Sequence, residues 1–151
     1  MEENQSKDIK KDSEILAEVY RNAQLALTSI SDILPEVEDE GIREEILHEH
    51  EEYERICSEA ANLARKYNLE LKEPGPIKKA MMWTAIKMDT ATDNSANHIA
   101  EMMIKGTVNG ITCLKTSLSE SEHVMDEEIK KLLCDLIAVE ESFETKLKAY
   151  L

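Results

Sequence analysis

The sequence has 151 residues, which is enough for one domain with a sizeable apolar core. It is 42% hydrophobic and 33% charged, and its formal net charge of −14 argues against a role on nucleic-acid phosphates or anionic membrane surfaces. The polar N-terminus has no apolar run behind it, and no stretch offers the roughly 20 apolar residues of a membrane span. We therefore expect a cytoplasmic protein that binds neither nucleic acid nor membrane.

Few helix breakers interrupt the chain, which holds four glycines and three prolines, and this favours long helices. We predict a flexible tail over residues 1–10 and a single helical domain over residues 11–151. The first helix should end near Ile33, because Pro35 pushes the residue before it out of the helical region. Its apolar residues recur at every third or fourth position, which predicts one buried stripe: Leu16, Val19, Ala23, Ala26, Ile30 and Ile33.

The next helices follow from the same periodicity. A second helix is predicted over residues 39–68; Pro74, Gly75 and Pro76 then break the chain before a short helix over 77–90. The polar stretch 88–97 separates this short helix from a third main helix over 94–118, and a fourth main helix begins after residue 128. The stripes of the second and fourth main helices alternate steps of four and three, as in bundles. They are Ile42, Ile46, Glu49, Tyr53, Ile56, Ala60, Leu63 and Tyr67, and Ile129, Leu133, Leu136, Glu140, Phe143, Leu147 and Tyr150.

The connection between the second and third main helices decides the topology. If the short helix is separate, residues 69–93 are long enough to cross the whole bundle, which gives an up-down-down-up order. We favour this ferritin-like order over a simple up-down-up-down bundle. The predicted fold is therefore all-α: an antiparallel four-helix bundle with a short extra helix in the crossover between helices two and three.

Two carboxylates, Glu49 and Glu140, occupy stripe positions that are otherwise apolar or aromatic. A charged group in a core costs several kcal/mol unless it is paired, protonated or bound to a cation. In the crossover topology both lie level with Glu101, while His98 shares a helix face with Glu101 and His50 adjoins Glu49. Such a layer could hold a metal, so these five residues are candidate ligands for iron or manganese. In the alternative, both glutamates reach outward to solvent, because a shift of one residue in register turns them away from the core.

The remaining chemistry-bearing residues indicate packing. Cys57, Cys113 and Cys134 lack CxxC spacing, so we expect buried, unpaired cysteines in a reducing compartment. The methionine-rich patches indicate core filling, and Gly106 with Gly110 indicates a close helix approach. No phosphate-binding loop, nucleophile elbow or catalytic-triad pattern occurs.

Four segments resemble the ferritin-like superfamily, and more closely the small, uncharacterised ferritin-like bundles of bacteria. They are EVYRNAQLAL, HEHEEYERI, AMMWTAIKM and NHIAEMMIKGTVNG, and the resemblance covers roughly residues 12–150. It implies four main helices with a short helix before the third. Di-iron members of the superfamily use Glu-x-x-His on two helices. Here Glu49 is followed three positions later by Glu52 and Glu140 by Phe143, so the resemblance implies the fold and not di-iron chemistry.

The incomplete constellation favours a binding or structural role over an enzymatic one, and we expect the protein to form a dimer. The alternative is a degenerate bundle that holds iron or manganese through carboxylates and histidines. An adaptor for a basic partner is a third hypothesis, based on the acidic charge.

Overall fold

A computed structural model describes residues 11–121 and 124–151, and within these ranges the regular structure is entirely helical. The α-helices are α1 (Asp12–Ile33), α2 (Glu40–Lys66), α3 (Pro76–Thr92), α4 (Ala96–Ser121) and α5 (Glu127–Lys148), and a 3-10 turn, η2 (Leu34–Glu36), follows α1. The predicted tail over residues 1–10 lies outside the described residues. No helix in the described ranges is both long and apolar enough to cross a membrane.

Local side chains set the ends of these helices. The carboxylate of Asp39 caps α2 by accepting a backbone N–H three residues on, at 2.9 Å, and Asp126 caps α5 in the same way. Pro76 begins α3, where its missing N–H leaves no helical bond unmade. Asn68 ends α2 with a φ of 55°, which lets the N–H of Leu69 reach a carbonyl one turn back. The predicted breaks are thereby confirmed, with helix ends shifted by at most a few residues.

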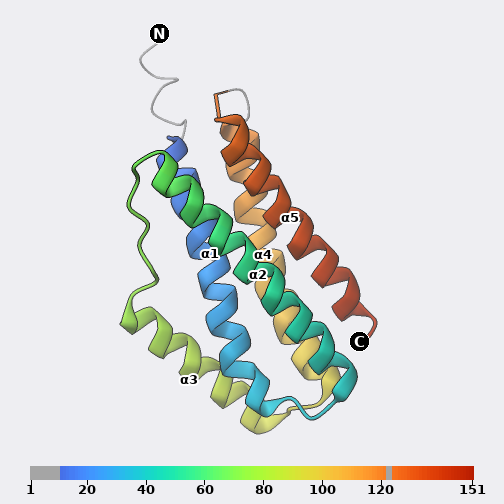
Figure 1. The fold of residues 1–151 in the computed structure, drawn as a ribbon. Helices are drawn as coiled ribbons and strands as arrows, with labels where there is room; N and C mark the ends of the chain where they lie inside the picture. The colour runs from blue at the N-terminus through green and yellow to red at the C-terminus, as the bar shows by residue number, and fades with distance from the viewer. Residues whose placement is uncertain (1–10, 122–123) are drawn as a thin grey trace.

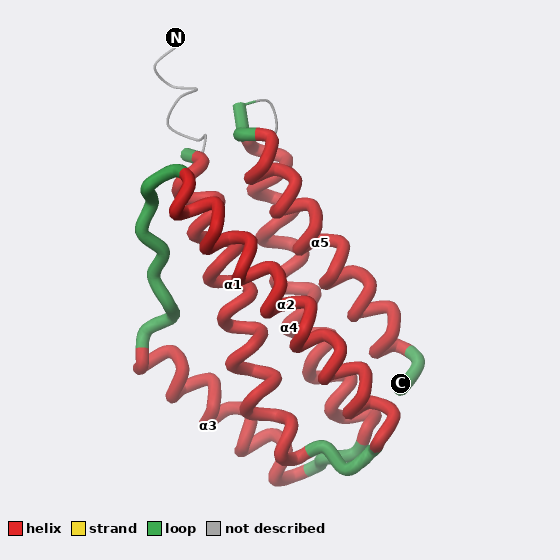
Figure 2. Tube along the Cα trace, viewed as in Figure 1, coloured by secondary structure: helices red, strands yellow, loops and turns green. Residues whose placement is uncertain are grey.

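The directions of the helices follow from Figure 1, in which α1 and α5 run downward while α2 and α4 run upward. Between α2 and α4 the chain returns along the outside, first as an extended connection and then as α3 (Figure 2). This return brings α3 against α1.

The packing leaves one side of the molecule open. Helix α1 packs along α2, α2 packs along α5, and α5 packs along α4, but α1 and α4 contact each other much less. Helix α3 packs against α1 beside this gap, and its residues Lys78, Met82 and Ile86 line it. The gap between α1 and α4 is where the site described below lies.

Most residues of the predicted stripes of α1, α2 and α5 are buried, as predicted. Four stripe residues are only half-buried: Ala26, Leu63, Tyr67 and Tyr150. The cysteine prediction is confirmed only for Cys57, which is buried. It is wrong for Cys113 and Cys134, which are exposed. Each lies one position from a buried leucine (Leu114 and Leu133), and a single step around a helix can turn a side chain out of the core.

Candidate functional site

The carboxylates of Glu49 and Glu140 both lie in the core, and each residue is only 2% exposed. The alternative in which they reach outward to solvent is therefore wrong. Helices α2 and α5 keep a strict stripe, so the glutamates take positions that apolar residues hold one turn before and after. The structure thus buries two acids in the contact between two helices.

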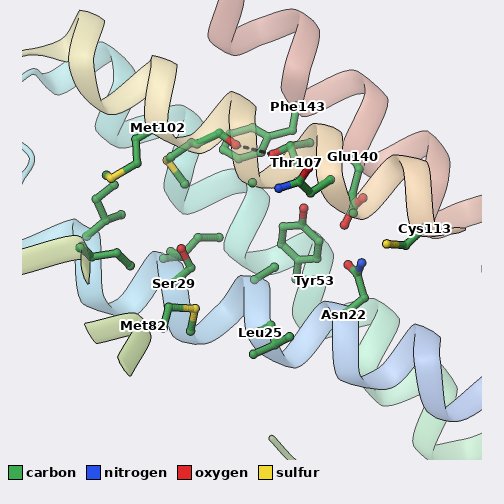
Figure 3. Close-up of a pocket in the computed structure, with 18 of the residues that line it drawn as sticks. Asn22, Leu25, Ser29, Tyr53, Met82, Met102, Thr107, Cys113, Glu140 and Phe143 are labelled. Carbon is green, nitrogen blue, oxygen red and sulfur yellow. Dashed lines mark hydrogen bonds between the residues drawn. The ribbon is translucent and has the colours of Figure 1, made fainter. Parts of the chain in front are cut away.

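Glu140 projects toward the gap between α1 and α4, where Gly110 makes room for it. A Cβ atom at Gly110 would lie 2.7 Å from Glu140 Oε2 and 3.0 Å from Asn22 Nδ2, so any larger residue would displace the carboxyl group. The hydroxyl of Tyr53 lies near the same carboxyl group. Figure 3 shows the Glu140 carboxyl, the Tyr53 hydroxyl and the Asn22 amide facing one another. Within residues 11–121 and 124–151, Glu140 Oε2 has no hydrogen-bond partner.

Glu49 faces the other side of the same contact. It lines a depression of about 270 Å³ between α2 and α5, together with Lys146. Lys146 also forms an ion pair with Glu45, at 3.8 Å between Nζ and Oε2. The charge of Glu49 is thus partly balanced by a cation of the chain, although its Oε1 atom has no hydrogen-bond partner in the described part of the chain.

Burial shifts the titration of both acids upward. It raises the pKa of Glu140 to about 8; the charge of Glu49 adds to this shift, and the Tyr53 hydroxyl opposes it. Burial raises the pKa of Glu49 to about 7, against the attraction of Lys146. At neutral pH Glu140 is therefore mostly protonated, and its carboxyl group can donate a hydrogen bond as well as accept one.

A cavity of about 450 Å³ occupies the gap between α1 and α4, with α3 and α5 contributing to its walls (Figure 3). Its lining is mostly apolar and includes Leu25, Ile30, Met82, Met102, Met103 and Phe143. The buried hydroxyl of Thr107 is already used, because it donates to the Met103 carbonyl at 2.8 Å. Gly106 also lines the cavity, and no atom lies within 4 Å of the point where its Cβ would be. The cavity is thus an apolar space with the Glu140 carboxyl group in its wall.

The other predicted metal ligands are not gathered around these acids. Glu101 is exposed and pairs with Lys105 at 3.8 Å, because α4 turns Ile99 and Met103 toward the core instead. The His50 ring lies 3.6 Å from a Glu54 carboxylate oxygen.

The ring of His98 lies 3.0 Å from Asp89 Oδ1, where α3 meets α4. Within residues 11–121 and 124–151, no group of three or more His, Cys, Asp or Glu side chains could hold a metal ion. The structure thus does not bring the five candidate ligands for iron or manganese, Glu49, His50, His98, Glu101 and Glu140, into one layer; it shows Glu49 and Glu140 as a pair of buried acids.

Comparisons of this chain with family models, curated proteins and solved structures found no match. Its site must be interpreted from its own geometry. Sequence reasoning identified neither the cavity nor the position of Asn22 beside Glu140. The one sequence signal near the cavity was the glycine pair Gly106 and Gly110, which was interpreted only as a close approach of two helices.

Proposed function

We propose that the chain is a binding protein that takes up a small, largely apolar molecule between α1 and α4, with the Glu140 carboxyl group as its polar contact. The cavity carries this proposal: about 450 Å³ is within the range of small-molecule sites, which combine apolar walls with a few polar groups. Methionines such as Met82, Met102 and Met103 suit such a wall, because their unbranched side chains adapt to different shapes.

The course of the chain supports the interpretation of the fold as a ferritin-like crossover bundle. In such bundles, ligand sites are built between facing helices, as this cavity is. A dimer and a cytoplasmic location stay predictions from the sequence, as does the absence of a complete catalytic constellation.

Methionine methyl NMR with indole, a small neutral probe, tests the proposal. Met82, Met102 and Met103 line the cavity, whereas Met81 and Met88 are exposed on α3 and do not line it. We expect indole to shift the three cavity methyl resonances and to leave those of Met81 and Met88 in place. Equal shifts at all five, or shifts at none, would contradict binding in the cavity.

Gly106→Phe provides the blocking variant, because open space surrounds its Cβ position and the ring can enter the cavity without a backbone clash. Gly106→Ala is the matched control, since a methyl group leaves most of the cavity free. We expect the phenylalanine variant to fold with native circular dichroism and to lose the indole-induced shifts, and the alanine variant to keep them.

A further inference from the structure

We infer that the ligand of this cavity carries a protonated amine on an apolar body, and that the Glu140 carboxylate recognises the amine as an ion pair. The inference rests on the proposed binding function and names the chemical class of its ligand.

Glu140 is 98% buried, and its Oε2 atom has no hydrogen-bond partner among the residues that the structure describes. The groups that face it are the Tyr53 hydroxyl from α2, the Asn22 amide from α1 and the Gly110 backbone from α4, with the acid Glu49 also near enough to interact. None of these groups carries a positive charge.

Among the described residues, no cation acts on the titration of Glu140. Lys146 acts on Glu49 and pairs with Glu45, and it is not among the groups that shift the titration of Glu140. Lys78, the one cationic residue among the described residues that line the cavity, is an exposed side chain of α3. A cation that reaches Glu140 through the cavity would therefore supply the charge that the chain does not.

An ammonium group fits this position better than other head groups. An anionic head would meet two acids in a protein of net charge −14. A metal ion would find only two carboxylates, with no third ligand of the usual kinds among the described side chains. An ammonium group needs three acceptors, and the Glu140 carboxyl group, the Tyr53 hydroxyl oxygen and the Asn22 side-chain carbonyl can provide them.

The proton balance of binding gives a signature. Because the pKa of Glu140 is raised to about 8, its carboxyl group is mostly protonated in the free protein at neutral pH. Forming the ion pair requires the carboxylate, so the carboxyl proton leaves to solvent when the ammonium group binds. An amine should therefore release close to one proton per molecule bound, and a neutral ligand of the same shape should release none.

The test compares phenylbutylamine, phenylbutanol and phenylbutanoate, which share one apolar body and differ in the head group. Isothermal titration calorimetry at neutral pH, in buffers of different ionisation enthalpy, measures both affinity and proton release. Cys113 lines the cavity and is exposed, so its alkylation should slow when the ligand is bound. Cys134, exposed and outside the cavity, is the internal control.

We expect the amine to bind at least about tenfold more tightly than the alcohol, which corresponds to about 1.4 kcal/mol, and to release a proton. The acid should bind weakest. In Glu140→Gln, the amine should lose its advantage over the alcohol and its proton release. Equal binding of amine and alcohol, or a preference that survives in Glu140→Gln, would overturn the amine assignment and leave the binding function standing. Failure of all three probes, with indole also failing to shift the cavity methionines, would overturn both.

Discussion

Replacing Glu140 by Gln should remove a loss of stability that the wild-type protein suffers as pH rises. Burial raises the pKa of this acid from its ordinary value of 4.5 to about 8. The unfolded chain loses the proton near the lower value and the folded chain near the higher one. The free energy of unfolding therefore falls as pH rises from about 4.5 to about 8, and Glu140 has no such effect below that window. At about 1.4 kcal/mol per unit, the loss reaches about 3 kcal/mol at neutral pH and about 5 kcal/mol when ionisation is complete.

Urea denaturation of wild type and Glu140→Gln at about pH 5, 7 and 9 checks this. Gln keeps the shape of the side chain and cannot ionise, so the stability difference between the two proteins should widen in favour of Gln as pH rises. Glu49→Gln should show the same trend with a smaller span, because its pKa is raised only to about 7. Glu101→Gln, on the exposed side of α4, is the control and should follow wild type. Parallel curves for wild type and Glu140→Gln would refute the assignment of Glu140 as the titrating acid.

Three further experiments test the packing around Gly110, the metal-binding hypothesis and the predicted dimer. Gly110→Ala should lower the free energy of unfolding by about 1–3 kcal/mol, because its methyl group would lie 2.7 Å from Glu140 Oε2. Gly106→Ala should raise it by about 0.5–1 kcal/mol, since the position is open and alanine favours helix. Chemical denaturation measures both free energies, and equal effects of the two variants would contradict the close contact. After the wild-type protein is loaded anaerobically with ferrous iron or manganese and desalted, elemental mass spectrometry should find no stoichiometric metal. A metal that wild type retains and that Glu49→Leu and Glu140→Leu lose would restore the metal-binding hypothesis. The predicted dimer is expected to use the exposed apolar face of α3, where Met81 is 69% exposed. Sedimentation equilibrium should then show a dimeric wild type and a Met81→Glu variant that dissociates into monomers. A monomeric wild type would reject the dimer.

The sequence placed Glu49 and Glu140 at stripe positions because the stripes on either side of them are regular, but it left open whether the two carboxylates are buried or reach outward to solvent. It failed for Glu101 because α4 has no such stripe: glycine, threonine and serine interrupt its apolar residues, and a rotation of one position sends Glu101 to solvent. The cavity could not be predicted at all. It depends on the distance between α1 and α4, which is set by the packing of all the helices and not by the pattern within either one.

Gly110 and Glu140 both work against stability, and they do so in contact with each other. Glycine inside a helix costs about 1 kcal/mol relative to alanine, and a buried acid without a cation costs more as pH rises. A core selected for stability alone would place an apolar side chain opposite a larger residue here. Leucine ends one atom short of the carboxylate oxygens, so Glu140→Leu leaves room for the methyl group of Gly110→Ala.

The double variant Gly110→Ala/Glu140→Leu should therefore be more stable than wild type above about pH 8, where the wild-type acid is ionised. It should also bind phenylbutylamine no better than phenylbutanol. Urea denaturation and calorimetry on the same preparation measure both properties. A double variant that is less stable than wild type at high pH would mean that the acid supports the fold itself, and the case that Glu140 is kept for binding would then fail.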